Sequence, residues 1–169
     1  TGATGPTGPN WILDPIPAII ANSLASRNTS GAFTVGCIFS VTENATLSWV
    51  EHYLINSGTE TYNAAIWNAA GTQLATVAVS ISASGRTRFA LASPLALTAG
   101  VKYNCGFWNS TNNAYIRQVG LGTHFPTTTS VATLFGNRIL VFATGVYGSG
   151  NNTRPTTTES DHMPYLGGI

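Results

Sequence analysis

Apolar and polar residues alternate along most of this chain, with the period of two that is typical of β-strands buried on one face. The alternating runs are rich in Val, Ile, Thr and aromatic residues, which favour strands. The dipeptides Ala70-Gly71 and Ala99-Gly100 interrupt the pattern where short turns are expected. The expected strands are residues 32–41, 45–56, the two runs of 61–82 that flank Ala70-Gly71, 86–94, 101–108, 114–122 and 137–148.

About eight short strands, separated by Gly, Asn and Pro and without a convincing amphipathic helix, predict an all-β antiparallel β-sandwich. Residues 11–32 contain two prolines (Pro15 and Pro17) and no clean period. We expect an ordered lead-in there, with a short helical turn around Ala18–Leu24.

The first ten residues follow a different pattern, with glycine at every third place. Only glycine fits the crowded axis of the collagen triple helix, and the flanking positions favour proline. The sequence therefore predicts a collagen-like stalk remnant at residues 1–10, too short to hold a triple helix alone, followed by a head domain at 11–169. The residues of the pattern are Gly2, Gly5 and Gly8, with Pro6 and Pro9 directly after two of them and Thr4 and Thr7 in the third position.

The composition of the chain limits the kinds of molecule that it is expected to bind. Charged residues make up only 8% of the chain, against about 25% in typical globular proteins. Seven Lys and Arg residues and a net charge of +1 give no basic patch for nucleic acid. No apolar run approaches 18 residues, so we expect no membrane insertion. The 38 Ser and Thr residues predict an uncharged, hydroxyl-rich surface that suits an extracellular or virion-surface protein.

Two cysteines, Cys37 and Cys105, lie in strand-like runs. They can form a disulfide if those strands are neighbours, and two buried free thiols fit the sequence equally well. Neither has a Cys-x-x-Cys partner or a histidine at ligand spacing, so we expect no metal site.

The six carboxylates offer no pair suited to glycoside hydrolysis. Glu43 and Glu60 fall in predicted turns, where we expect them to be solvated. Glu51 and His52 are adjacent on a strand and so point to opposite faces.

The densest group of potential ligands is Glu159, Asp161 and His162, which we interpret as part of a solvated loop. Because no Gly-x-Ser-x-Gly motif or phosphate-binding glycine loop is present either, we expect no catalytic residues and no cofactor.

A sugar-binding site requires fewer specific groups than a catalytic site. It needs an exposed aromatic ring that stacks on a pyranose, and amide and guanidinium groups that form hydrogen bonds with the sugar hydroxyls. The segment FWNSTNNAYIRQ supplies these groups in a predicted loop, where Trp108 faces outward if the alternate residues of the preceding strand face inward. In the alternative interpretation the segment is a hairpin in which Trp108 or Tyr115 packs in the core. Trp49 and Trp67 lie within strands and are expected in the core. The candidate glycan-binding residues are Trp108, Asn109, Asn112, Asn113, Tyr115 and Arg117.

The middle of the chain, about residues 33–125, resembles a family of secreted bacterial modules of unknown function. That resemblance implies a jelly-roll-like sandwich, often attached to carbohydrate-active or surface proteins. Its joining to collagen-like triplets resembles the trimeric fibres and receptor-binding tips of bacteriophages and large viruses. The resemblance is carried by core and turn positions: Trp67, Gly71, Leu74, Ala75, Phe89, Pro94, Leu97, Gly100 and Tyr103.

From these observations we expect a non-enzymatic, homotrimeric head domain of a collagen-like viral or phage fibre, which attaches to a cell-surface glycan or receptor. Three shallow sugar sites on one trimer gain strength by avidity. The alternative is a purely structural trimerisation cap of a bacterial surface or spore filament. A sialidase-like or esterase tip is a third and weaker alternative.

Overall fold

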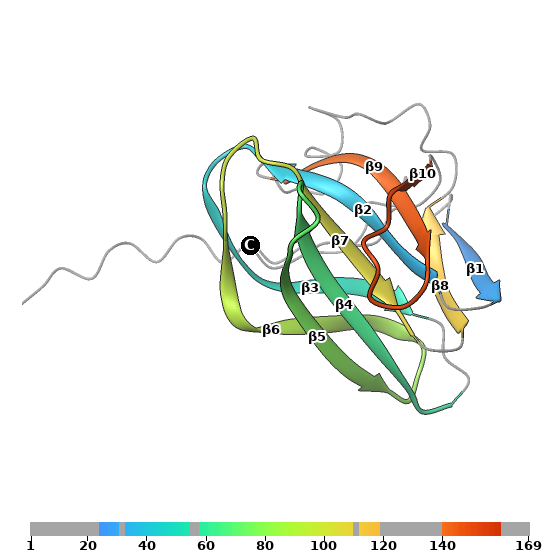
Figure 1. The fold of residues 1–169 in the computed structure, drawn as a ribbon. Helices are drawn as coiled ribbons and strands as arrows, with labels where there is room; N and C mark the ends of the chain where they lie inside the picture. Colours follow the sequence, from blue (N-terminus) through green and yellow to red (C-terminus); the bar gives the residue numbers. More distant parts are fainter. Residues whose placement is uncertain (1–23, 31–32, 55–57, 110–111, 119–139, 160–169) are drawn as a thin grey trace, which may run out of the picture.

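The computed structural model describes residues 24–30, 33–54, 58–109, 112–118 and 140–159 (Figure 1). The described residues form ten strands in two antiparallel sheets, which confirms the expected all-β sandwich. They contain no helix capable of crossing a bilayer. The strands are β1 (Leu24–Ser30), β2 (Phe33–Val41), β3 (Ala45–Leu54), β4 (Glu60–Asn68), β5 (Gln73–Ile81), β6 (Gly85–Leu97), β7 (Tyr103–Trp108), β8 (Asn112–Gln118), β9 (Leu140–Ser149) and β10 (Thr157–Glu159).

The larger sheet has six strands in the order β10-β9-β2-β7-β4-β5, and the smaller has four in the order β1-β8-β3-β6. In the larger sheet, β7 lies between β2 and β4 and is paired with both. In the smaller sheet, β8 pairs along its whole length with β1 but meets β3 only at Leu54 and Tyr115. Strands that are distant in sequence are therefore neighbours in both sheets.

The two turns expected at Ala70-Gly71 and Ala99-Gly100 are confirmed. Gly71 has a φ of 92°, and its amide donates to the carbonyl oxygen of Asn68 (3.0 Å). The Asn68 side chain accepts a second bond from the Thr72 amide through Oδ1 (2.8 Å). Gly100 has a φ of 73°, so both turns use a conformation in which a side chain is strained.

The main core lies between the sheets and consists of the inward-facing residues of both. Three of its rings are in direct contact: Phe107 lies 4.7 Å from His52 and 5.3 Å from Phe89 between ring centroids. The buried members are Val35, Cys37, Phe39, Val41, Leu47, Val50, Leu54, Tyr62, Ala64, Ile66, Ile81, Phe89, Leu97, Tyr103, Cys105 and Phe107.

Part of the outer face of the larger sheet, over β7, is also covered. Residues 150–156, which we call the β9–β10 connection, fold back over β7 (Figure 1). The Asn104 amide donates to the Pro155 carbonyl (2.7 Å), and the Thr34 hydroxyl donates to the Gly150 carbonyl (2.8 Å). A Cβ added to Gly106 would lie 2.6 Å from a Thr34 methyl group and 3.4 Å from the Pro155 ring. Glycine at this position therefore makes room for Thr34 and the Trp67 ring, while the Pro155 ring lies at ordinary contact distance.

Two strands were not expected. Leu24 begins β1, although the sequence suggests a helical turn ending there, and β10 lies in a segment predicted as a loop. Both are edge strands, and their short polar runs carry little apolar alternation. The remainder of that turn, the collagen-like residues 1–10, and Asp161 and His162 lie outside the described residues.

Candidate functional site

The structure buries Trp108 instead of presenting it to solvent. As strand alternation predicts, it faces away from Phe107, on the outer side of the larger sheet. On that side Trp108 packs with Ala65 and Trp67, its ring 6.4 Å from that of Trp67, and is only 5% exposed. Trp108 thus lies on the outward side, as predicted, but the prediction that it is exposed there for stacking on a sugar is wrong.

Asn109 is also buried, and its amide donates to the Glu60 carboxylate (Nδ2–Oε2, 3.0 Å). The prediction that Glu60 is solvated in a turn is wrong, because Glu60 is the half-buried first residue of β4. Glu43 is exposed, as predicted.

The predicted glycan loop is divided between the two sheets. Trp108 ends β7 in the larger sheet, whereas β8 belongs to the smaller sheet. The segment is thus mostly strand, and its members do not form one cluster of loop residues. Their side chains in β8 lie outside the described part of the chain, so ligand binding by them stays a prediction. The backbone positions concerned are Asn112, Asn113, Tyr115 and Arg117.

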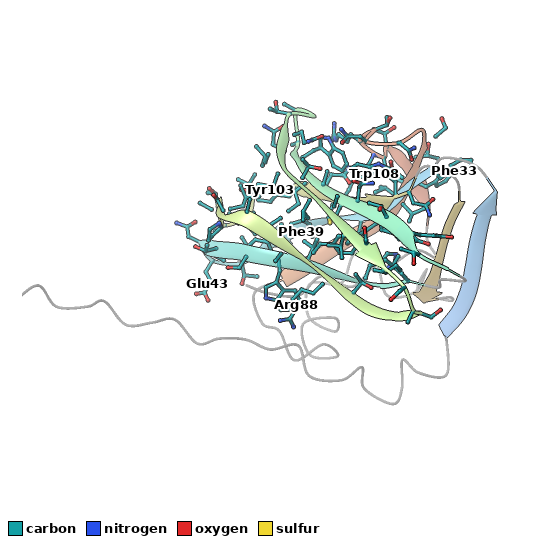
Figure 2. The ribbon with its side chains drawn as sticks, turned by 90° about the horizontal axis from the view of Figure 1, so that it is seen from below. Phe33, Phe39, Glu43, Arg88, Tyr103 and Trp108 are labelled. Carbon is teal, nitrogen blue, oxygen red and sulfur yellow. The ribbon has the colours of Figure 1, made fainter. Side chains whose placement is uncertain are left out.

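Trp49 and Trp67 were both expected in the core. Trp67 is 3% exposed, as expected of a buried residue, but it belongs to the small outer cluster with Trp108. Trp49 is half-buried on the outer side of the smaller sheet, where the Arg88 guanidinium carbon lies 3.8 Å from its ring centroid. A register shift between Leu47 and Trp49 breaks the alternation and turns Trp49 outward. Figure 2 shows Arg88 and Trp108 on opposite sides of the sandwich.

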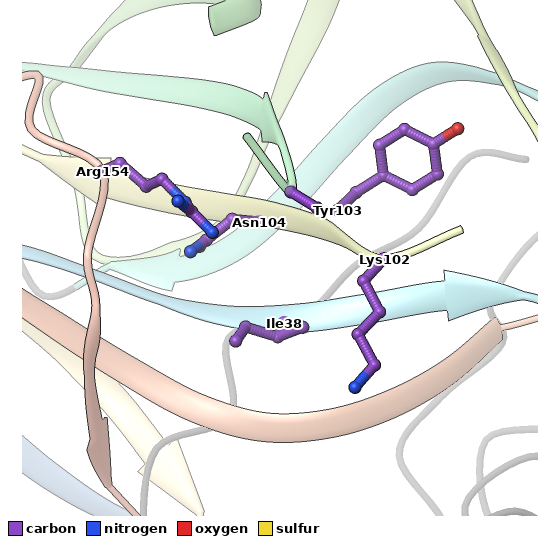
Figure 3. A pocket seen from close by; sticks show the side chains of 6 residues that line it. Ile38, Lys102, Tyr103, Asn104 and Arg154 are labelled. Atoms are coloured by element: carbon purple, nitrogen blue, oxygen red, sulfur yellow. The ribbon is translucent and has the colours of Figure 1, made fainter. Parts of the chain in front are cut away.

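A pocket of about 80 Å³ opens at the start of β7, beside the β9–β10 connection (Figure 3). Arg154 reaches from the connection toward Asn104, and Lys102 lies at the opposite end of the lining. A volume of this size is sufficient for a small chemical group. The lining residues are Ile38, Ala69, Lys102, Tyr103, Asn104 and Arg154.

The pocket combines two cations with a buried amide. Asn104 is 2% exposed, and its nitrogen donates to Pro155 while its Oδ1 has no hydrogen-bond partner among the described residues. Nε of Arg154 is also buried and has no hydrogen-bond partner among the described residues. The Tyr103 hydroxyl is engaged, because it accepts from the Thr98 amide (2.9 Å). The lining surface is mostly apolar, and these few polar groups suit an acidic or hydroxyl-bearing substituent.

Sequence reasoning named Tyr103 as a core or turn position but did not single out the other pocket residues. The irregular segment after β9 was noted as a place where sites often occur, but nothing in the pattern indicated that it folds over β7. Among the described residues no group of three or more His, Cys, Asp and Glu is placed to hold a metal ion.

A family model described as "Domain of unknown function (DUF4082)" matches residues 20–166. A search of the curated proteins finds no match. The matched range contains every described strand. Within it, Trp67, Phe89, Leu97 and Tyr103 are buried, and the glycines of the two turns have positive φ. The positions that carry the family resemblance in the sequence therefore include core and turn positions of this fold.

Proposed function

The chain belongs to this family of domains of unknown function, and we propose that it serves as a non-enzymatic, homotrimeric head domain of a collagen-like viral or phage fibre. In this proposal the head attaches the fibre to glycans on a cell surface. The observation that carries it is the run of three glycine triplets directly before a β-sandwich domain.

The trimer follows from the chemistry of the stalk. A collagen helix needs three chains in register, and three short triplets cannot align them. A domain at the end of the stalk that self-associates brings the three chains together. Each head then presents three copies of any binding site, and simultaneous contacts raise the overall affinity by about 10²–10⁴ over one site.

The pocket beside the β9–β10 connection supports glycan contact better than Trp108 does. The cationic groups of Lys102 and Arg154 donate hydrogen bonds, which sugar hydroxyl and carboxylate oxygens accept. Its small volume suits a protruding substituent of a sugar, such as a carboxylate or a hydroxymethyl group. A weak, shallow contact of this kind is sufficient when it is repeated three times.

Sedimentation equilibrium tests the trimer, with the full chain and with a chain that begins at residue 11. We expect a trimer in both cases, because the head carries the association. A monomer in both cases at micromolar concentration would overturn the proposal. A trimer only with the triplets would place the association in the stalk and contradict a self-associating head.

A glycan array probed with the trimer tests attachment. We expect binding to a subset of glycans, and a loss of at least about fivefold in Lys102→Ala and in Arg154→Ala, as removal of a charged hydrogen bond predicts. Arg88→Ala is the matched control, because it removes a cation on the opposite side of the sandwich. Binding that is unchanged in both pocket variants would reject the pocket. A stable trimer without glycan or cell binding would favour the alternative, a structural trimerisation cap.

A further inference from the structure

Two thiols meet across neighbouring strands in the centre of the larger sheet. Cys37 of β2 and Cys105 of β7 are direct partners in the antiparallel register. Both belong to the core cluster, both are 0% exposed, and both are free thiols in the structure. Nothing in the proposed attachment function uses them.

Their placement matches what a disulfide requires. Directly opposed residues of an antiparallel pair have Cα atoms about 4.5–5.5 Å apart, within the range of about 4.4–6.8 Å found for disulfides. Their side chains lie on the same face of the sheet, because both are in the core between the sheets. The two strands also approach closely here: a Cβ added to Gly36 would overlap the carbonyl oxygen of Cys105.

We propose that Cys37 and Cys105 form an intramolecular, cross-strand disulfide when the chain folds in the presence of a small-molecule disulfide. One cysteine thiolate attacks the oxidant and forms a mixed disulfide, which releases one small thiol. The second cysteine thiolate then attacks the protein sulfur of that mixed disulfide, which releases the other small thiol. The protein loses two protons and two electrons, and the oxidant is reduced to two thiols.

The bond forms during folding and not in the finished domain. Burial raises the pKa of the Cys37 thiol far above its usual range. The pKa of Cys105 is raised by burial and, to a smaller extent, by the neighbouring Cys37. Because only the thiolate reacts, the folded and reduced protein exchanges slowly, whereas the unfolded chain presents ordinary thiols.

The experiment compares two routes to oxidation. The reduced chain is unfolded in denaturant and refolded with oxidised glutathione, and a second sample is treated with the same reagent while folded. We expect the refolded protein to have lost the mass of two hydrogen atoms and to show no free thiol in denaturant. The folded sample retains both thiols over the same time. The disulfide raises the melting temperature by about 10 °C, since it closes a long loop between β2 and β7.

A register-shifted variant is the matched control. Val35→Cys combined with Cys37→Ala places the thiol on the same strand, on the same buried face, two residues from its original position. This thiol is diagonal to Cys105, about 7–8 Å away, which is too far for the bond. We expect this variant to stay reduced or to take up glutathione on refolding.

Two outcomes would overturn the proposal. One is native-like wild-type protein that keeps two free thiols, or carries two glutathione adducts, after refolding. The other is oxidation of the register-shifted variant as completely as the wild type. The wild-type measurement needs no variant, so the proposal remains testable if the control folds poorly.

Discussion

β5 and β7 belong to the same sheet but are buried differently. Along β5, exposed residues alternate with half-buried ones up to a buried final residue. All six residues of β7 are buried. The difference arises from position, because β5 is an edge strand paired only with β4, whereas β7 lies between two strands and beneath the β9–β10 connection.

The outward residues of the two strands have different roles. In β5, Thr76, Ala78 and Ser80 are exposed. In β7, the Asn104 side chain bonds the connection, and Gly106 leaves space for Thr34 and the Trp67 ring. A polar or small residue at an alternate position therefore does not by itself identify a solvent-facing side. It can equally mark the place where another segment of the chain is bound.

The largest expected effect is a difference in stability between substitutions on the inward faces of β7 and β5. Phe107→Ala in β7 removes a fully buried ring that contacts His52 and Phe89, and we expect a loss of about 4 kcal/mol of unfolding free energy. The matched change in β5, Val77→Ala, removes a half-buried side chain and costs about 1 kcal/mol. Urea denaturation measures both. Equal losses would contradict the contrast between a central and an edge strand.

A pH titration is the second test, because β7 carries a buried thiol inward and β5 has no titratable residue. The pKa values of Cys37 and Cys105 are raised on folding, so their contribution is complete below the ordinary thiol value of 9.0 and is lost as pH rises above it. At pH 10 the reduced protein loses on the order of 1 kcal/mol for each thiol.

The control for this titration is the double variant Cys37→Ala and Cys105→Ala, which lacks both thiols. Denaturant unfolding of the two reduced proteins at pH 7 and pH 10 isolates the thiol contribution from that of other titrating groups. A difference between them that does not change with pH would show that the thiols ionise equally well in the folded state.

The third test concerns the outer face. Gly106→Ala places a methyl group 2.6 Å from Thr34 and 3.1 Å from the Trp67 ring. We expect a cost of about 2 kcal/mol from overpacking, together with faster proteolysis of the β9–β10 connection. Ala78→Val on the exposed side of β5 changes stability by less than about 0.5 kcal/mol. Unchanged proteolysis in Gly106→Ala would mean that the connection does not depend on this glycine.

These contrasts mark how far the sequence predicts the fold. Period-two alternation identified the runs that became β2 to β9, and in β2 to β7 the apolar face of each run is directed into the core. The turns at Gly71 and Gly100 were predictable since positive φ favours glycine. The pairing of Cys37 with Cys105 was left open, because strand order depends on contacts between residues that are distant in sequence.

The candidate site was less predictable for the same reason. Alternation gave the correct side for Trp108, but its burial depends on packing with Ala65 and Trp67 of β4, a strand that is distant in sequence. Trp49 was misplaced because a register shift near Leu47 interrupts the strict alternation. The pocket at Lys102 and Arg154 joins two segments whose proximity no local pattern indicates.

The smallest expected effect concerns outward-facing hydrogen bonds, one made by β5 and one made by β7. Ser80→Ala removes the exposed bond between the Thr61 and Ser80 hydroxyl groups (3.0 Å), which water replaces, so we expect a change below about 0.5 kcal/mol. Asn104→Ala removes the buried bond to Pro155 and leaves that carbonyl unsatisfied, at a cost of about 1–2 kcal/mol. Urea denaturation of the two variants decides the point. If Asn104→Ala is as mild as Ser80→Ala, water reaches the Pro155 carbonyl, and the connection covers β7 less tightly than its contacts indicate.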